Sequence, residues 1–307
     1  MRQTIDSLAR TPLSQVVVGV VVLTIIRFAI APILNNTPAH QRMGMYKFLR
    51  FFNEFIDALV YAGIFVFLVI RPFVLQAFLI PSGSMWPTLY VNDFIVANKA
   101  IYRFSEPKVG DIIVFRPPVE AVGPNDIGPD GQVKVDYIKR MVGGPGDIIE
   151  IRAGQIYRNG QLVQEPFKSY SECTRQVGTD CADFRKLSDL EIAGLTKANF
   201  KLVKQNGKII PFNWTQYDGN SMQPHVENFS EGSPYPIAAK YAVSDQADAD
   251  KLKAEPAEKI PPGHYLMMGD NRNGSFDGRA WGLIPRDAIV GRSEAIWLPF
   301  SRLGITR

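Results

Sequence analysis

Two small hydroxyl side chains stand one residue apart in the stretch FLIPSGSMWPTL, residues 78–89. Ser82 and Ser84 share this stretch with glycine and proline, and all three residue types are ordinary in turns. A turn without chemistry is therefore one interpretation. The other is that one of the serines is a nucleophile, which requires a positioned base to accept its proton.

Lys139 is the best candidate for that base because of the strand face on which it lies. In a strand over VKVDYIKRMV, residues 133–142, successive side chains alternate between two faces. The other residues on its face are hydrophobic or aromatic, namely Val133, Val135, Tyr137 and Met141. Burial there would lower the lysine pKa from about 10.4 by up to about 5 units and leave a neutral amine. Lysines on apolar faces also commonly extend to solvent and stay charged, and the pattern alone does not decide.

A histidine base is the alternative to Lys139. The chain has three histidines, and His40 lies in a predicted loop between two apolar segments. A Ser/His/Asp triad would therefore need His225 or His264. The Ser/Lys dyad, which is a variant of the same logic, is the stronger constellation.

Two apolar segments near the N-terminus predict a membrane anchor. Residues 16–34 contain one charge, Arg27, and residues 55–71 contain Asp57 and end on Arg71. A bilayer core of about 30 Å requires roughly 20 apolar residues per helix, so each segment is predicted to span it. A pair of buried core helices is the alternative. A cleaved signal peptide fits poorly, because no small-residue cleavage pattern follows the first segment.

The loop between these segments predicts the orientation of the chain. Arg42, Lys47 and Arg50 lie there against Glu54. Because positive residues favour the cytoplasmic side, the part of the chain after the second segment is expected outside the cytoplasm.

Composition limits the remaining function classes. The 307 residues are 46% hydrophobic and 21% charged, which is typical of a folded protein. The net charge is only +4 and no dense Lys/Arg block occurs, so nucleic acid is not an expected partner.

The two cysteines, Cys173 and Cys181, lie eight positions apart. Outside the cytoplasm a disulfide between them is favoured over free thiols. No further Cys or His stands near them, so no metal site is expected there.

Short β-branched and aromatic runs between turn signals predict a mainly β fold after residue 72. The runs cover residues 93–102, 111–118, 133–142, 147–154 and 154–163, and the last contains the hairpin signal Asn159-Gly160. We expect an antiparallel β-rich catalytic domain with an inserted second subdomain, preceded by two transmembrane helices. The predicted division is a membrane anchor over 1–71, a catalytic domain over 72–163 plus 259–307, and an insertion over 164–258.

Four stretches resemble the sequence boxes of the bacterial type I signal peptidases, also called leader peptidases. In chain order they are PSGSMWPTL (81–89), GDIIVFRPP (110–118), DYIKRMVGGPGD (136–147) and GDNRNGSFDGRAWG (269–282). The resemblance runs from about residue 72 to 165 and again from about 260 to 300. It implies a β-rich body with a variable inserted subdomain, which residues 164–258 fit. Two N-terminal membrane segments are similar to the Gram-negative form of the family.

The resemblance also assigns roles to individual residues. It implies that Ser84 is the nucleophile, Lys139 the general base and Ser82 an oxyanion-hole donor beside the Ser84 N–H. Ser275 is similar to the serine that orients the lysine. The remaining matches are Ile80 and Ile138 for substrate pockets, and Asp270, Arg140, Asp277 and Arg279 for supporting ion pairs.

Two departures from the family pattern are visible. Asn273-Gly274 replaces the more usual Asp-Asn in the last box, and Trp86 stands where a small or apolar residue is common. Cys173 and Cys181 are similar in placement to a disulfide of some Gram-negative members.

The function implied by the resemblance is a membrane-bound serine endopeptidase that cleaves signal peptides after small residues, of the Ala-x-Ala type. The expected partners are preprotein substrates with signal peptides and the lipid bilayer, and no cofactor is expected. The expected location is the bacterial inner membrane, with two spans and the catalytic domain on the extracytoplasmic side. A specialised processing peptidase, for example for pilus subunits, and a non-enzymatic membrane-anchored peptide-binding β-domain are the alternatives.

Overall fold

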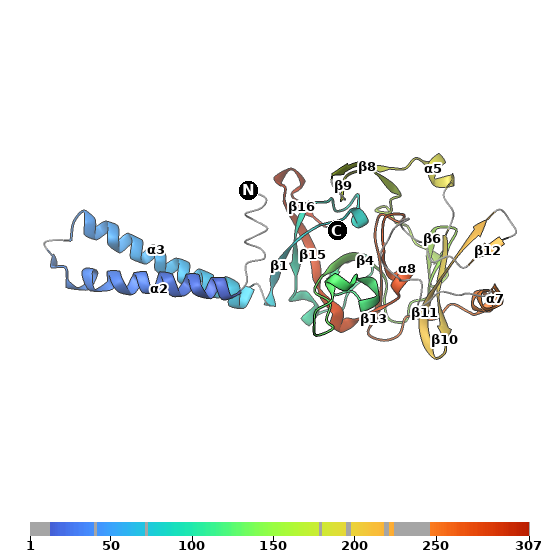
Figure 1. Ribbon diagram of the computed structural model, residues 1–307, viewed down its shortest axis with the longest axis horizontal. Coiled ribbons are helices and arrows are strands. Elements are labelled where there is room, and N and C mark those ends of the chain that lie inside the picture. Colours follow the sequence, from blue (N-terminus) through green and yellow to red (C-terminus); the bar gives the residue numbers. More distant parts are fainter. Residues whose placement is uncertain are drawn as a thin grey trace. The chain divides into compact units, whose positions relative to one another are not determined.

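The computed structural model describes residues 13–39, 42–70, 73–177, 180–194, 198–217, 221–223 and 246–306. The chain divides into two compact units (Figure 1). The first comprises residues 1–78 and 98–100, and the second residues 79–97 and 101–307.

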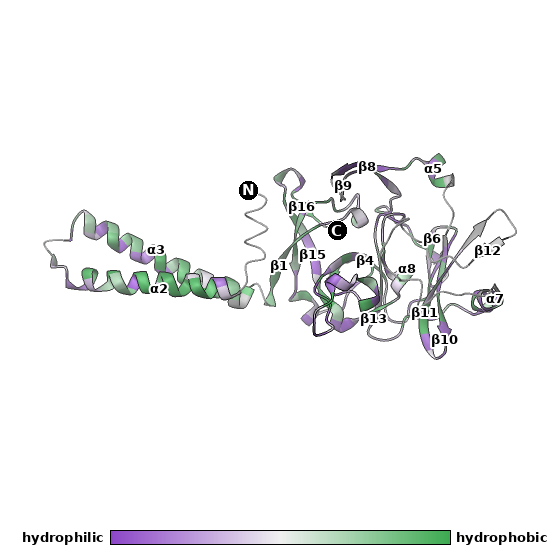
Figure 2. Ribbon diagram, in the orientation of Figure 1, coloured by the Kyte–Doolittle hydropathy of each residue, from purple (hydrophilic) through white to green (hydrophobic). Residues whose placement is uncertain are grey.

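The first unit is built on a pair of packed helices, α2 (Leu13–Asn36) and α3 (Met45–Phe65). A π-helical turn, Val66–Ile70, continues α3, and β1 (Leu75–Leu79) follows. Figure 2 shows the predominantly hydrophobic colouring of α2. Many of its large apolar side chains are exposed, including Val17, Val18, Val21, Val22, Ile25 and Phe28. Such a surface is unfavourable in water and suits a lipid environment.

Among the residues that the structure describes, one helix is long and apolar enough to cross a membrane. It covers Ser14–Asn36 with a mean hydropathy of 2.6. The second expected span, residues 55–71, corresponds to the C-terminal part of α3 and the π-helical turn. The N-terminal part of α3 carries Lys47, Arg50 and Glu54, so the helix as a whole does not have the composition of a span. One apolar helix is established in this way, and a second remains a prediction.

The second unit contains most of the strands. Its larger sheet has the order β2-β15-β3-β4-β13-β14, and β16 pairs with β15. The bounds are β2 Phe94–Asn98, β3 Ile112–Phe115, β4 Tyr137–Gly143, β13 His264–Met268, β14 Ile284–Pro285, β15 Ile289–Leu298 and β16 Gly304–Ile305. The pairs β15/β3, β3/β4 and β4/β13 are antiparallel. The mainly antiparallel β fold predicted from the sequence is confirmed.

A second sheet has the order β12-β11-β10-β5-β6-β7. Its strands are β5 Ile149–Arg152, β6 Gln155–Arg158, β7 Gln161–Leu162, β10 Ala198–Gln205, β11 Lys208–Tyr217 and β12 Ser221–Gln223. The predicted Asn159-Gly160 hairpin joins β6 to β7, and both residues have the positive φ that this turn needs (53° and 79°). Because β10 pairs with β5, the segment 164–258 adds strands to a sheet that begins before it.

A two-stranded hairpin and three short helices also belong to this unit. The hairpin β8 (Ser171–Val177) and β9 (Asp180–Lys186) forms its own two-stranded sheet. Short helices are α5 Asp189–Gly194, α7 Gln246–Ala254 and α8 Gly278–Trp281. Of these, α5 and α7 lie within the predicted insertion, residues 164–258.

Alternate side chains of β4 and β13 face two different hydrophobic clusters. Met141 and Met267 lie in a cluster with Ile113, Phe115, Tyr265 and Trp281. Val142, Leu266 and Met268 lie in another, which contains Ile149, Ile151 and Phe200 of the second sheet. Both faces of these central strands are therefore largely buried, and the charged side chains of Lys139 and Arg140 on β4 are removed from solvent.

The strand that carries Lys139 is shorter than predicted. β4 begins at Tyr137, whereas the sequence pattern predicted a strand from Val133. Val133 instead forms an isolated bridge with Ile127. Successive side chains still alternate between the two faces from Tyr137 onward. The expected burial of Lys139 therefore does not depend on residues 133–136, which precede β4.

Candidate active site

The serine stretch forms a tight turn anchored by buried apolar side chains. Ser82 has extended backbone angles, and Gly83–Met85 follows as a single 3-10 turn. Met85 and Leu89 are fully buried. The Trp86 N–H donates to the Gly83 carbonyl oxygen at 3.0 Å, which closes the turn. The turn thus holds the Ser84 backbone in one conformation.

Lys139 reaches this turn from β4. Its Nζ lies 2.7 Å from Ser84 Oγ and 3.1 Å from the carbonyl oxygen of Ile138. Lys139 is 5% exposed, so the buried alternative is confirmed and the solvent-directed one is wrong. Opposite it on β3 stands Ile113, which is fully buried. The apolar cluster on this face explains why the amine is desolvated.

Burial lowers the pKa of Lys139 to about 8 from its usual 10.5. The carboxylates of Asp277 and Asp270 oppose this change, and the Arg279 guanidinium adds to it. Ser84 is 7% exposed. The arrangement places an amine with a lowered pKa within hydrogen-bond distance of a serine hydroxyl, which is the geometry that general-base activation requires.

Ser82 lies on the solvent side of Ser84. It is exposed, and its Oγ is 3.4 Å from Ser84 Oγ. That separation is long for a hydroxyl–hydroxyl hydrogen bond. The Ser82 hydroxyl can therefore rotate to another acceptor at little cost.

Two buried ion pairs support the site from the last sequence box. Arg140 binds Asp270 through Nε at 2.8 Å and Nη2 at 2.7 Å. The Arg279 Nε lies 2.9 Å from Asp277 Oδ1. Burial alone would raise the pKa of Asp277, but Arg279 outweighs it and holds the pKa below its usual value. All four predicted ion-pair residues are thus buried beside the dyad strand or in the loop facing it.

Ser275 is buried, and among the hydrogen bonds of the described residues none joins it to Lys139. Its hydroxyl instead lies near the Asp277 carboxylate, whose pKa it helps to lower. It packs against Gly269, where an added Cβ would lie 2.2 Å from Ser275 Oγ and 2.5 Å from the Ser84 carbonyl oxygen. Gly269 therefore allows the Ser275 segment and the Ser84 turn to approach each other, and the orienting role stays a prediction.

Each predicted pocket residue precedes one member of the dyad in the sequence. Ile80 is 2% exposed and precedes the serine turn, and Ile138 is half-buried and precedes Lys139. The Ile80 N–H donates to the Asp93 carbonyl oxygen at 2.8 Å.

The sequence reasoning missed three side chains that hold the site together. The Asn271 N–H donates to the Ser84 carbonyl oxygen at 3.1 Å, and its Nδ2 donates to the Gly83 carbonyl oxygen at 3.2 Å. Arg272 forms a buried pair with Glu165, in which Nη2 lies 2.5 Å from Oε1. Asn271 and Arg272 stand inside the box GDNRNGS, directly after Asp270, and that position was the signal that could have found them.

The histidine alternatives gain no support. The His264 Nδ1 lies 3.0 Å from the carbonyl oxygen of Pro262, and no described contact joins this ring to Ser84. His225 lies outside the described residues.

The structure links Cys173 to Cys181 by a disulfide with Cα atoms 5.7 Å apart. Among all the residues that the structure describes, no group of three or more His, Cys, Asp or Glu is placed to hold a metal ion.

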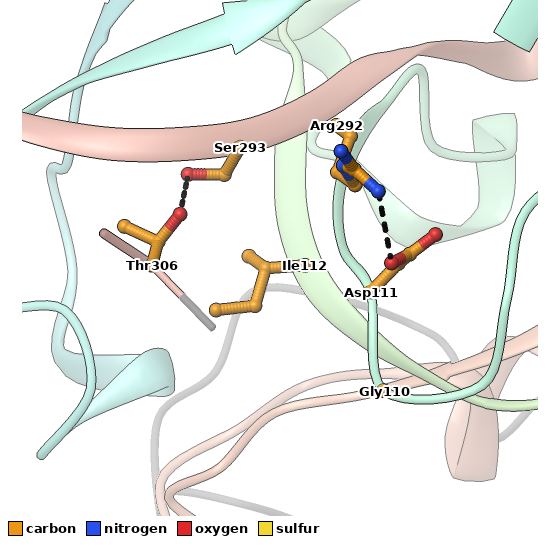
Figure 3. A pocket seen from close by; sticks show the side chains of 6 residues that line it. All are labelled: Gly110, Asp111, Ile112, Arg292, Ser293 and Thr306. Carbon is orange, nitrogen blue, oxygen red and sulfur yellow. Dashed lines mark hydrogen bonds and ion pairs between the residues drawn. The ribbon is translucent and has the colours of Figure 1, made fainter. Parts of the chain in front are cut away.

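Neither dyad residue lines the pocket of 220 Å³ that is drawn in Figure 3. Gly110, Asp111, Ile112, Arg292, Ser293 and Thr306 line it. The Arg292 guanidinium there is held by Glu294 at 2.9 Å and faces Asp111 at 3.7 Å. Its charge is balanced within the protein, so this pocket adds no group to the serine–lysine chemistry.

Comparison with known proteins places the chain in a family. Residues 52–298 match the family described as signal peptidase, peptidase S26. The chain belongs to this family. It is accordingly a signal peptidase enzyme, and the reaction of the family is cleavage of signal peptides by a serine peptidase.

Individual relatives agree with this assignment. Signal peptidase I of Aquifex aeolicus (strain VF5) is 30% identical over 237 residues, which cover 75% of this chain and 78% of that protein. Signal peptidase I of Pseudomonas aeruginosa is 29% identical over 276 residues, covering 79% and 75%. The crystal structure of a signal peptidase I from Enterococcus faecalis V583 covers 61% of this chain and 97% of its own at 17% identity, with a TM-score of 0.28. That score is too low to support a statement about the fold. The family is membrane-anchored, and the apolar helix α2 is compatible with insertion.

Proposed function

We propose that the chain removes signal peptides after small residues of the Ala-x-Ala type, through a Ser84/Lys139 dyad and an acyl-enzyme. The observation that carries the proposal is the distance of 2.7 Å between Lys139 Nζ and Ser84 Oγ in a buried setting. With a pKa of about 8, about a tenth of the lysine is neutral at pH 7. At the usual pKa of 10.5 the neutral fraction would be roughly three hundred times smaller.

The reaction follows from these two groups. Lys139 Nζ accepts the Ser84 proton while Ser84 Oγ bonds to the scissile carbonyl carbon. The resulting tetrahedral intermediate expels the amine of the mature protein, which takes the proton from the Lys139 ammonium. Neutral Lys139 then removes a proton from water, the hydroxide attacks the acyl-enzyme, and the signal peptide leaves with a carboxylate while Ser84 recovers its proton.

The Ser84 N–H and the Ser82 hydroxyl are the proposed oxyanion donors. Ser82 is exposed, and its 3.4 Å contact with Ser84 is weak, so its hydroxyl is available to a substrate oxygen. Loss of one such donor elsewhere costs about 3 kcal/mol of transition-state stabilisation. The supporting ion pairs act by holding the backbone on which the dyad depends.

One edge of β4 is the proposed binding place for the extended substrate. β3 pairs with β4 from Tyr137 to Arg140, and β13 pairs along the opposite edge only from Arg140 to Gly143. The described pairing of β13 with that opposite edge therefore does not occupy Ile138 and Lys139. An extended peptide could pair there by strand addition. Ile80 and Ile138 would then border the pockets for small side chains.

The proposed topology has two membrane spans, α2 and the apolar end of α3, with their connecting loop in the cytoplasm. The catalytic unit then lies on the extracytoplasmic side of the bacterial inner membrane, with the lipid bilayer and preproteins as partners. Confining enzyme and substrate to one bilayer raises their effective concentration. Arg42, which precedes α3, and Lys47 and Arg50 in the N-terminal part of α3 support this orientation.

Processing of a panel of unrelated preproteins tests the proposal. Purified full-length wild type in detergent should cut each preprotein after its Ala-x-Ala site, as read by mass spectrometry. Ser84→Ala and Lys139→Ala should lose nearly all activity, and Lys139→His should show whether another base can substitute. Lys134→Ala is the matched control, because this lysine is exposed on the segment before β4.

Each outcome separates the proposal from its rivals. Cleavage of one narrow substrate class would favour a specialised processing peptidase. No cleavage by wild type, with full cellular function in both dyad variants, would favour a non-enzymatic binding domain. Activity that persists in Lys139→Ala would show that a different base serves Ser84.

A further inference from the structure

The ring of Phe184 fills the space that a side chain at position 83 would occupy. A Cβ built on Gly83 would lie 2.0 Å from Phe184 Cζ and 2.2 Å from Cε2. Gly83 is buried and stands between Ser82 and Ser84. Phe184 comes from β9, far along the chain from Gly83, and it is half-buried.

This contact accounts for the glycine in the serine turn. Gly83 is not among the glycines with positive φ, so its backbone conformation is open to any residue. What excludes a side chain is the ring of Phe184. The serine turn therefore packs closely against the β8–β9 hairpin, whose strands are labelled in Figure 1.

The peptide between Gly83 and Ser84 is the one whose orientation matters. Its carbonyl oxygen accepts from Asn271 Nδ2 at 3.2 Å and from the Trp86 N–H at 3.0 Å. Because the peptide is planar and trans, its N–H, which belongs to Ser84, points the opposite way. The two hydrogen bonds to the Gly83 carbonyl oxygen thus fix the direction of the Ser84 N–H, the proposed oxyanion donor. The Phe184 ring packs against Gly83 at one end of the same peptide plane.

The hairpin that carries Phe184 is fastened at both ends. Phe184 stands opposite Cys173 in the β8–β9 pairing, and Cys173 is bonded to Cys181 of β9. At the base of the hairpin, the Asn273 side chain accepts from the Ser171 N–H and donates to the Ser171 carbonyl oxygen, each at 2.8 Å. Asn273 is the departure from the family pattern, and an aspartate in its place could not make the second bond.

We propose that Phe184 is a positioning residue for the oxyanion hole. The hairpin, held by the disulfide and by Asn273, presses its ring on Gly83 and fixes the peptide that supplies the Ser84 N–H. The inference rests on the proposed function and deepens it. Phe184 itself touches no reacting atom, so its removal changes how well the transition state is stabilised rather than which groups react.

Kinetics of Phe184→Ala in the full-length enzyme test the inference. We expect kcat to fall by about tenfold to a hundredfold, since a displacement of about 1 Å in such a site has effects of this size. KM should change little. The midpoint of the pH–rate profile should match that of wild type, because the Ser84–Lys139 contact is untouched. Phe104→Ala is the matched control, since Phe104 is 89% exposed, and its kcat should equal that of wild type.

A double-mutant cycle with Gly83→Ala provides a second and independent reading. In the wild-type background the added Cβ collides with the Phe184 ring, so kcat should fall. In the Phe184→Ala background the space is open, and Gly83→Ala should cause no further loss. Phe184→Leu keeps a branched side chain at the contact and should recover part of the activity, which also serves if Phe184→Ala does not fold.

The outcomes distinguish this inference from the proposed function. Equal kcat in Phe184→Ala and wild type, or additive losses in the cycle, would overturn the positioning role and leave the dyad standing. A shifted pH midpoint with unchanged plateau activity would also overturn it, because Phe184 would then act through Lys139. If wild type itself cleaves no preprotein, the proposed function is contradicted instead.

Discussion

The Lys139→Met variant measures how much the buried amine lowers the free energy of unfolding. The folded pKa of about 8 lies below the usual 10.5. The cost is therefore complete below pH 8, and it disappears as the pH rises past 10.5. At 1.36 kcal/mol per unit, the cost is about 3 kcal/mol at pH 7 and about 2 kcal/mol at pH 9.

Methionine keeps the length and apolar stem of the side chain and removes the charge. It also removes the Nζ contacts with Ser84 Oγ and the Ile138 carbonyl oxygen, each worth about 1 kcal/mol. The net expectation is a variant more stable than wild type by about 1 kcal/mol at pH 7, with almost no difference at pH 9. For a protein of this size that gain is a rise of about 2 to 4 °C in Tm.

Thermal unfolding of the detergent-solubilised full chain at pH 7, 8 and 9 is the assay. Lys134→Met is the control, because Lys134 is exposed and the same substitution there should give a difference from wild type that does not vary with pH. A Lys139→Met variant whose Tm difference from wild type stays constant over this range would refute the reasoning. So would a variant that is less stable at pH 7 than at pH 9, relative to wild type.

Two further expectations concern the reaction and the buried charges. The kcat/KM of wild type on a fluorogenic signal-peptide substrate should rise about tenfold per pH unit and level off near pH 8, and a midpoint near 10.5 would contradict a desolvated lysine. Arg272→Ala leaves Glu165 as an unpaired buried carboxylate, since both partners are less than 5% exposed, and should destabilise the protein by about 3 to 5 kcal/mol. Arg152→Ala, which breaks an exposed pair, should leave Tm close to wild type, and equal Tm losses in the two variants would rule out the buried-charge explanation.

The sequence predicted the dyad because each half has a local signal. Ser84 stands in a turn stretch after an apolar run, and Lys139 stands on an apolar strand face. Period-two alternation made burial of Lys139 one of two possibilities, and the resemblance to the family boxes assigned the roles. The start of the strand was wrong, since Val133 bridges to Ile127 instead of extending β4. Boundary positions depend on which segment happens to lie alongside, and alternation in one segment does not report that.

The parts of the site that were missed depend on contacts between distant segments. Asn271 bonds to Gly83 over a separation of 188 residues, and Phe184 contacts the same glycine from a hairpin within the predicted insertion, for which no strand was predicted. The strands β10 and β11 were also missed, although the Asn206-Gly207 pair between them has the positive φ angles of a hairpin turn (49° and 79°). The polar character of the surrounding segment hid a signal that was present.

The pairing of Arg27 on α2 with Asp57 on α3 bears on how the chain enters a bilayer. The two charged groups lie 2.5 Å apart, and their side chains are 38% and 30% exposed. A single charge at the centre of a spanning helix costs about 2.5 to 3.5 kcal/mol during insertion. In the proposed topology, α2 and α3 would enter the bilayer together as a helical hairpin. The charges of Arg27 and Asp57 would then neutralise each other during insertion. The pair would also fix the depth and rotation of α3 against α2 once both are in the membrane.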